Sequence, residues 1–437
     1  MDIKNKRFVM ISNRGPNFTS NNTLHRGMGG TKEIYARLVE NFCKGWICLA
    51  SSELKSDSVQ SEYRAVLKIL FIEKDKYANY YYKYVSEYLY PSLLGYPEKA
   101  NPNHSPEDFN DICKDIVECV KDTYGQTDVM ICDYHLFKIP SLIDWDCKKI
   151  FLWFIPILTE EYYTHEMKEI VWSLAQCDEI YFFNEIWSYN FKKAFNHYYP
   201  DEPLKTKVRS LMMGPDEDYT LTENISRETY VELLSNKLSL QNIHGKKYLL
   251  SVSRMDFVKN IPLSIQGFEK YLEGNPEDSQ LDLILIAPHH RKDSDVYIAE
   301  TTKIKTLVEQ SKFRDRIHLT HEYFNADELR ILFKFANAFV CPSTFDAVPL
   351  TPLEYVLANE NDGAVILSDS IGAYMLVFPN CYDFHHEDVD SLAQAIKKSM
   401  HDSTEMRQER MQIMKSVIME ESLQKSMEKL KTYLNNV

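Results

Sequence analysis

Short apolar runs alternate with longer amphipathic stretches along most of this chain. Such an alternation predicts strands that alternate with helices, the pattern of a parallel sheet covered by helices. In the first half, the runs predicted to be strands are Phe8–Ser12, Val129–Cys132, Ile150–Ile155 and Glu179–Phe183. Residues 32–43 are predicted to form a helix, because Ile34, Leu38 and Phe42 recur on one side at helical spacing.

The second half repeats this pattern after a polar stretch, Asn224–Gly245, in which the strand signals lapse. Its predicted strands are residues 248–253, 281–287, 316–319, 338–341 and 364–368. We therefore expect an α/β protein with two Rossmann-like, doubly wound parallel sheets. Two further helical stretches are predicted: the tyrosine-rich residues 77–90, and a tail, 405–434, whose apolar stripe is Leu423, Met427, Leu430 and Leu434.

Length, charge and cysteine content limit what the chain can be. Its 437 residues exceed the roughly 250–300 at which a single core stops growing, so two domains are expected. A formal net charge of −14 disfavours nucleic acid or an anionic membrane as partner. Nine scattered cysteines without a Cys-x-x-Cys pair, no signal-peptide core and no long apolar run together predict a cytoplasmic protein.

Charged residues follow three predicted strands of the second half. Arg254 and Lys259 come after the first strand, Arg291 after the second, and Asp346 and Glu354 after the fourth. The carboxyl ends of parallel strands meet at one edge of the sheet, where open α/β sheets bind ligands. Cations there can neutralise a diphosphate, whereas the ordinary interpretation is a solvated basic turn and two carboxylates near a helix start.

The first half carries two weaker signals. Ser12-Asn13-Arg14 follows the first strand, and Gly29-Gly30 precedes a predicted helix. A glycine pair allows the backbone to approach a ligand closely. A plain turn that leads into a helix is the commoner meaning, and the pair is not part of a Walker loop.

The histidines and paired acids of the sequence lack the spacing of a metal site. Asp144 and Asp146 form an isolated pair in an acidic chain, and His165-Glu166 lacks the second histidine of a zinc-protease helix. His289-His290 has no cysteine or carboxylate at ligand spacing. We expect no metal site.

Taken together, these segments resemble the trehalose-6-phosphate synthase family, retaining glycosyltransferases of the two-Rossmann GT-B fold. The resemblance extends over nearly the whole chain. The segments that match in the family's order are Ser12-Asn-Arg14, Gly29-Gly30, Asp133-Tyr-His-Leu136, Ile155-Pro156, Arg254-Met-Asp-Phe-Val-Lys259, Ile286-Ala-Pro-x-x-Arg291, Asp346 to Glu354, and Leu367-Ser-x-x-x-Gly-Ala373.

The resemblance implies a role for each matching position. Arg254 and Lys259 would hold the donor diphosphate and assist catalysis, and Asp133 would orient the acceptor hydroxyls. The other implied donor positions are Gly29 and Gly30 at the phosphates, Phe324 and Leu329 at the base, Asp346, Ala347, Val348 and Leu350 at the sugar, Glu354 at the ribose, and Phe154. The implied acceptor-phosphate positions are Arg14, Tyr81, Tyr90 and Arg291.

The resemblance also implies functions for the parts of the chain. Residues 1–235 would form the acceptor-binding domain and residues 236–415 the nucleotide-sugar domain, with residues 416–437 a helix that packs back on the first. The donor would be UDP- or GDP-linked, the acceptor a phosphorylated sugar or cyclitol, and no cofactor or metal would be needed. Formation of a homo-oligomer is left open.

Several positions depart from the family pattern where the transferred group is expected. The family's histidine near the donor sugar is here Phe154, and Pro349 removes one backbone donor from the acidic loop. A tryptophan near the acceptor phosphate is Tyr90, and a histidine before the Asp-Tyr-His segment is Cys132. A pocket that loses a polar partner no longer favours the matching hydroxyl. We hypothesise a donor other than ordinary glucose, such as a deoxy sugar, pentose or cyclitol.

Two alternatives to a sugar-transferring enzyme remain at this point. Gly-Gly-Thr31 and Ser343-Thr-x-Asp346 look like validoxylamine 7′-phosphate synthase-like pseudoglycosyltransferases, which form a C–N bond between a nucleotide-linked cyclitol and an aminocyclitol phosphate. A catalytically silent regulatory subunit is the other alternative, with Phe154 marking lost activity. Retention of the charged positions, Arg254 and Lys259 among them, argues against the silent subunit.

Overall fold

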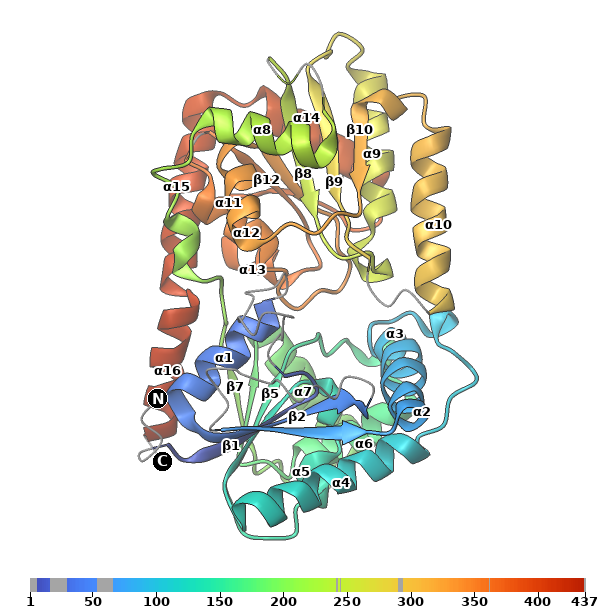
Figure 1. The fold of residues 1–437 in the computed structure, drawn as a ribbon, viewed down its shortest axis with the longest axis vertical. Coiled ribbons are helices and arrows are strands. Elements are labelled where there is room, and N and C mark those ends of the chain that lie inside the picture. The colour runs from blue at the N-terminus through green and yellow to red at the C-terminus, as the bar shows by residue number, and fades with distance from the viewer. Residues whose placement is uncertain are drawn as a thin grey trace. The chain divides into compact units, whose positions relative to one another are not determined.

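The computed structural model describes residues 6–15, 30–52, 66–240, 243, 245–289, 294–360 and 362–435. The chain divides into two compact units (Figure 1). Unit 1 comprises Met1–Met212 together with Lys429–Val437, and unit 2 comprises Met213–Glu428. Each unit contains one sheet, and each is described by itself.

Unit 1 is built on a seven-stranded parallel sheet with the order β3-β2-β1-β4-β5-β6-β7. The strands are β1 (Phe8–Ser12), β2 (Cys43–Ser51), β3 (Leu67–Ile72), β4 (Val129–Cys132), β5 (Lys149–Trp153), β6 (Glu179–Phe182) and β7 (Lys207–Ser210). The helices include α1 (Gly30–Phe42), α2 (Lys74–Tyr77), a π-helix (Ala78–Leu89), α3 (Tyr90–Leu93), α4 (Glu107–Tyr124), α5 (Ile139–Leu142), α6 (His165–Leu174) and α7 (Glu185–Tyr198).

Unit 2 repeats this design on a six-stranded parallel sheet with the order β10-β9-β8-β11-β12-β13. The strands are β8 (Lys247–Val252), β9 (Leu281–Ile286), β10 (Ile317–Thr320), β11 (Ala338–Cys341), β12 (Ala364–Ser368) and β13 (Tyr382–Phe384). The helices are α8 (Arg227–Leu238), α9 (Ile261–Gly274), α10 (Asp295–Gln310), α11 (Ala326–Phe335), α12 (Thr351–Ala358), α13 (Gly372–Val377), α14 (Val389–His401), α15 (Thr404–Glu420) and the first part of α16 (Leu423–Asn435).

The strand orders determine where ligands can bind. In both sheets the chain first builds outward in one direction and then returns to the first strand to build the other side. Such a reversal leaves a crevice beyond the carboxyl ends of the two strands at the switch point. The switch lies between β1 and β4 in unit 1, and between β8 and β11 in unit 2. The residues after these four strands are therefore the first candidates for a site.

The predicted two-sheet α/β fold is confirmed, and several elements are added. The central strands are almost fully buried, as strands covered on both faces are. Four strands escaped prediction: β2, β3, β7 and β13. The polar stretch expected between the halves lies inside unit 2 and forms α8, whereas the division by contacts falls between Met212 and Met213. The functional division at residue 235 stays a prediction.

The C-terminal tail is helical as predicted, but it is two helices rather than one. α15 ends at Glu420 and α16 begins at Leu423, and the carbonyl of Glu421 accepts a hydrogen bond from the Gly214 N–H at 3.0 Å. The predicted apolar stripe of α16 is buried. In unit 1 the ring of Tyr433 stacks on Tyr181, at 6.1 Å between centroids.

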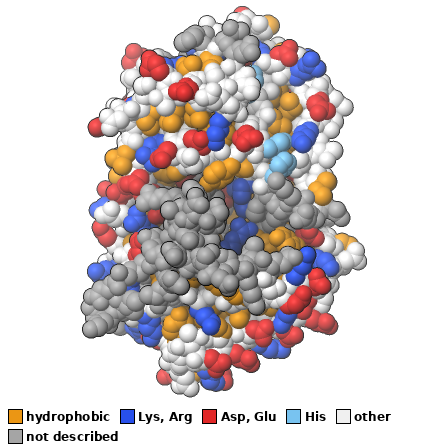
Figure 2. Space-filling view, viewed as in Figure 1, with side chains coloured by type: hydrophobic (Ala, Val, Ile, Leu, Met, Phe, Trp, Pro, Cys, Tyr) orange, Lys and Arg blue, Asp and Glu red, His pale blue; other side chains and the backbone are white. Residues whose placement is uncertain are grey.

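The surface carries side chains of both charges, and the cysteines are not paired. Acidic and basic side chains are interspersed over the face shown in Figure 2. All nine cysteines lie among the described residues and are free thiols. Among the helices that the structure describes, none has the length and apolarity needed to cross a bilayer.

Candidate active site

In unit 1 a row of polar side chains crosses the switch point between β1 and β4. Arg14 follows β1, donates a hydrogen bond to the Tyr81 hydroxyl and lies over the Tyr81 ring, 5.3 Å from its centroid. The row continues with His135, whose ring stacks on that of Tyr81 with 6.0 Å between centroids. His135 Nδ1 lies 3.2 Å from Oδ2 of Asp133, the residue that follows β4. These four side chains thus form a continuous series of contacts from the end of β1 to the end of β4.

The backbone after β4 is held in an unusual conformation. Asp133 has φ = 78°, in the left-handed region that residues other than glycine rarely adopt. Its Oδ1 accepts a hydrogen bond from the Tyr134 N–H at 2.8 Å, which stabilises the turn locally. Such strained residues cluster at functional sites. The turn directs the carboxylate of Asp133 to His135.

The tyrosine-rich segment is a π-helix, and it is fixed against the end of β1. The Tyr80 hydroxyl donates to Asn13 Oδ1 at 2.8 Å, and both side chains are buried. Because Tyr80 is anchored there, the adjacent Tyr81 is brought to Arg14. Tyr77 stacks on Tyr81 at 5.6 Å. Burial raises the pKa of Tyr77 to about 12, although the charge of Arg14 opposes this, so Tyr77 stays a neutral hydroxyl.

Phe154 lies in an aromatic stack rather than beside a polar group. It follows β5 and packs face to face with Phe183, 5.1 Å away at an interplanar angle of 6°. On α1, Tyr35 stacks on it at 6.0 Å. Burial, with a contribution from the charge of Asp133, raises the pKa of Tyr35. These three aromatic side chains are buried, and none of them carries a charge near neutral pH.

Tyr90, the position at which the family has tryptophan, is also held by an aromatic partner. Its ring stacks on Tyr134 with 5.6 Å between centroids. Tyr134 is itself next to Asp133 and tilts against His135 at 4.0 Å. Tyr90 thus belongs to the same group of side chains as Arg14 and Tyr81, through Tyr134 and His135.

In unit 2 the two strand ends at the switch point are joined by an ion pair. Lys259 lies after β8 and pairs with Asp346, which lies after β11. Both side chains are mostly buried, with 15% and 17% exposed. Arg254, 38% exposed, lies 3.8 Å from the fully buried Asp256, which accepts a hydrogen bond from the Val258 N–H. The two predicted cations are thus at the expected edge, and each faces a carboxylate.

Glu354, in the first turn of α12, has an unusual protonation state. Burial raises its pKa to about 8; a hydrogen bond from Tyr219 opposes the shift and the charge of Asp216 adds to it. Burial and the nearby Glu354 in turn raise the pKa of Tyr219. Near neutral pH the carboxyl is therefore mostly protonated and can donate as well as accept a hydrogen bond.

The loop that carries Asp346 is positioned by a glycine. The Gly372 N–H, at the start of α13, donates to the Asp346 carbonyl at 3.0 Å. A Cβ at position 372 would lie 1.6 Å from the carbonyl oxygen of Ala347. Only glycine permits this approach, so the matching Gly-Ala segment serves to place the acidic loop.

The structure does not bring every predicted residue to an accessible position. Phe324 and Leu329 are 0% and 2% exposed, so both side chains belong to the core of unit 2. Ala347 is also buried. Gly29 and Arg291 lie outside the described residues, and Gly30 is the first residue of α1. Val348 and Leu350 lie on the loop between Asp346 and α12, as expected from the sequence.

Sequence reasoning missed two polar members of these groups. His135 was part of a matching segment, and its position two residues after Asp133 was the signal that both belong to one turn. Tyr219, which hydrogen-bonds Glu354, lies in a short 3-10 helix far from that residue in sequence, and no pattern singles it out.

Together, the two doubly wound parallel sheets, each with charged groups at its switch point, have the architecture of the GT-B fold class. The sequence profile of glycosyltransferase family 20 matches residues 6–436, and the chain belongs to that family. The UDP-forming α,α-trehalose-phosphate synthase of Encephalitozoon cuniculi is 27% identical over 329 residues, which cover 71% of this chain and 69% of the relative. Synthase A of Dictyostelium discoideum is 23% identical over 84% of this chain, and the match spans 54% of that longer relative.

Solved structures are similar over nearly the full chain. The synthase of Burkholderia vietnamiensis superposes with a TM-score of 0.85 at 16% identity, covering 99% of this chain and all of that one. The synthase of Burkholderia xenovorans in complex with glucose-6-phosphate has a TM-score of 0.82 at 20% identity, covering 98% of this chain and 100% of that one. The predicted enzyme class and fold are thereby confirmed: the chain is a trehalose-6-phosphate synthase-like glycosyltransferase.

Proposed function

We propose that this protein transfers a glycosyl group, with retention, from a UDP-linked donor to a sugar phosphate. The observation that carries the proposal is the ion pair Lys259–Asp346 at the switch point of unit 2, which joins the two strand ends where a nucleotide diphosphate is expected. Relatives are named UDP-forming synthases, and one solved relative holds glucose-6-phosphate. Both facts favour UDP over GDP and a hexose phosphate as acceptor.

The arrangement in unit 1 supports a phosphorylated acceptor. Arg14 supplies a fixed positive charge, and its bond to the Tyr81 hydroxyl orients the guanidinium. A guanidinium suits phosphate because it donates two parallel hydrogen bonds. Asp133 and His135, on the same row, can accept and donate hydrogen bonds to the hydroxyls of a sugar.

The reaction we propose needs no nucleophilic side chain and no metal. The bond between the donor's anomeric carbon and the diphosphate oxygen breaks, and an acceptor hydroxyl forms a bond on the same face. The proton of that hydroxyl passes to the departing phosphate oxygen. Arg254 and Lys259 stabilise the negative charge that grows there, which is where preorganised cations contribute most to rate.

We further propose that the transferred group is less polar than glucose near Phe154. Phe154 stacks on Tyr35 and on Phe183, so a buried aromatic group stands where the family pattern has a histidine. A donor hydroxyl placed there would lose a hydrogen bond that water had supplied, and buried unpaired groups carry a penalty. A deoxy sugar, pentose or cyclitol avoids it.

The same stack favours one second candidate, the C–N-forming pseudoglycosyltransferase. A nucleotide-linked cyclitol differs from glucose in its polar groups, so it is also compatible with an aromatic residue at position 154. The acceptor would then be an aminocyclitol phosphate, and Arg14 would bind its phosphate as it would that of a sugar phosphate. Mass analysis of the product separates an amine-linked compound from one with an O-glycosidic bond.

A transfer assay tests the proposal. Purified protein is given a panel of UDP-, GDP- and ADP-linked donors with glucose-6-phosphate or an aminocyclitol phosphate, and the products are identified. We expect a phosphorylated two-ring product, a UDP-linked donor, and a preference for a donor other than UDP-glucose. Preference for UDP-glucose would contradict the altered pocket, and no product with any pair would contradict the transferase.

Lys259→Ala in the same assay should lower turnover by orders of magnitude, since removing one preorganised charge-stabilising group costs about 100–1,000-fold. Lys270→Ala is the matched control, because Lys270 lies on α9 of the same unit in an exposed pair with Asp390. Equal turnover of the two variants would contradict the role given to Lys259.

A further inference from the structure

A histidine and carboxylate cluster lies at the edge of unit 2, apart from the residues given roles above. It follows from strand pairing: β12 and β13 are parallel, with Ser368 opposite Phe384. The residues that come next, Asp369 and His385, therefore meet beyond the carboxyl ends of the two strands. The Asp369 N–H donates to the Phe384 carbonyl at 3.1 Å, which holds the two exits together.

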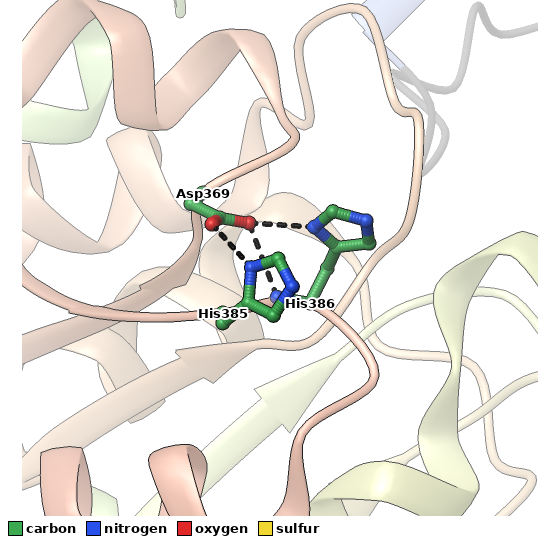
Figure 3. Close-up of side chains that lie close together, drawn as sticks. All are labelled: Asp369, His385 and His386. Atoms are coloured by element: carbon green, nitrogen blue, oxygen red, sulfur yellow. Dashed lines mark hydrogen bonds and ion pairs between the residues drawn. The ribbon is translucent and has the colours of Figure 1, made fainter.

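Both imidazoles direct Nδ1 to the same carboxylate (Figure 3). His385 Nδ1 lies 2.9 Å from Asp369 Oδ2, and His386 Nδ1 lies 2.7 Å from Oδ1. One ligand atom from each of the three residues lies within 4.8 Å of the others. Two nitrogens and one oxygen thus lie close enough together for a single ion to bind all three in place of the two hydrogen bonds.

The backbone positions these ligands in advance. The His386 N–H donates to Asp369 Oδ1 at 3.1 Å, and the His385 N–H donates to Ser391 Oγ at 3.0 Å. Ser391 lies in the first turn of α14, where Asp388 caps the helix. The three residues are therefore held by a strand end, a turn and the start of a helix. Little conformational entropy would be lost when an ion binds.

The ligand set selects a class of ion. Two imidazoles and one carboxylate suit Zn²⁺ and similar divalent transition ions, whereas Ca²⁺ and Mg²⁺ prefer sites made of oxygen. The net charge of −14 favours cation binding in general.

We propose that Asp369, His385 and His386 form a binding site for a divalent transition-metal ion such as Zn²⁺. Three protein ligands leave the remaining coordination positions to water, as the 66% exposure of the His385 side chain allows. The sequence led us to expect no metal site, because the histidines and paired acids considered there lacked ligand spacing. Asp369 and His385 come together only through the pairing of β12 with β13. The inference does not depend on the proposed transfer reaction.

The site is connected to the acidic loop of the donor region. The ring of His386 lies 5.8 Å from that of Phe345, which directly precedes Asp346 and has φ = 52°. An ion that fixes His386 also restricts the position of Phe345. Metal binding should therefore stabilise unit 2 where Asp346 pairs with Lys259.

Titration with ZnCl₂, followed by calorimetry, and with CoCl₂, followed by visible absorption, tests the site on the full chain. We expect one ion per chain, and Asp369→Asn and His386→Gln should each weaken binding by at least the roughly 10–100-fold typical of losing even an outer-shell partner. His385→Gln is the variant least able to disturb folding, since the ring is exposed. His401→Gln removes an exposed histidine from α14 and is the matched control.

Two results would overturn the proposal. One is the absence of saturable binding to wild-type protein at millimolar Zn²⁺, which would make the cluster an ordinary carboxylate and imidazole pairing. The other is binding that His385→Gln and Asp369→Asn leave unchanged while circular dichroism shows both variants folded. Transfer activity plays no part in either readout.

Discussion

At the scale of single residues, the proposed donor preference depends on Phe154. Its ring stacks on those of Tyr35 and Phe183, and all three side chains are buried. Phe154→His would place an imidazole at this position. We expect a rise of about tenfold in kcat/KM for UDP-glucose relative to the preferred donor, since one recovered hydrogen bond contributes roughly 1 kcal/mol or slightly more.

Phe154→Leu is the control for that prediction, because it removes the ring without adding a polar nitrogen. The comparison uses initial rates with both donors in competition. An unchanged donor ratio in Phe154→His, with normal folding, would contradict the role given to position 154.

Glu354 predicts a pH dependence of stability. Its pKa rises from the usual 4.5 to about 8 on folding, chiefly because of burial. Between these values the folded state binds one more proton than the unfolded state, so the free energy of unfolding falls as pH rises. The loss at high pH is on the order of a few kcal/mol, because one pKa unit corresponds to about 1.4 kcal/mol.

Glu354→Gln should remove this dependence. Its stability relative to the wild type should be greater at pH 8.5 than at pH 5.5, as measured by urea unfolding at both values. A constant difference between the two proteins across that range would show that Glu354 ionises as easily in the fold as in the unfolded chain.

At the scale of elements, most of the strands that are both buried and mainly apolar could be predicted. β1, β4, β9 and β11 are of this kind because both faces are covered, although β9 contains Asp282. The internal strand β2 and the edge strands β3 and β7 contain Lys44, Lys68 and Lys207 and escaped prediction, whereas the edge strand β10 was predicted. β13 has only three residues, so the cluster that it forms with Asp369 could not be anticipated.

The candidate site could likewise be predicted only in part. Strand ends are recognisable in sequence, so Arg254 and Lys259 could be placed after β8, whereas Asp133 was singled out only by the family resemblance. The partner of a residue could not be assigned, because pairing of Lys259 with Asp346 and of Glu354 with Tyr219 depends on turns distant in the chain.

The contact between α13 and the acidic loop gives a prediction for an element. Gly372→Ala would bring a Cβ onto the Ala347 carbonyl, so the loop or the helix must shift. We expect a loss of roughly 1–3 kcal/mol in stability, as for other overpacked sites, together with weaker UDP binding. Thermal unfolding and calorimetry measure the two effects.

Gly274→Ala is the matched control, because no atom lies within 4 Å of the added Cβ at the end of α9. Its UDP affinity should equal that of the wild type. If Gly372→Ala also bound UDP normally, the acidic loop would not be part of the donor site.

At the scale of the whole molecule, two similar sheets carry different chemistry at equivalent places. Unit 1 presents Arg14 among tyrosines, which suits a phosphate monoester and sugar hydroxyls. Unit 2 presents two cations and two acids, which suits a nucleotide diphosphate. This difference fits a member of glycosyltransferase family 20, because glycosyl transfer needs both a donor and an acceptor.

The measurement that tests the account most directly is UDP affinity of the wild type, Lys259→Ala and Lys270→Ala, determined by calorimetry at one salt concentration. A charge-assisted hydrogen bond contributes about 1.5–3 kcal/mol, so Lys259→Ala should bind UDP roughly 10–100-fold more weakly while Lys270→Ala equals the wild type. Equal affinity of all three proteins, or no UDP binding by the wild type, would contradict the claim that the strand ends of unit 2 hold a nucleotide diphosphate.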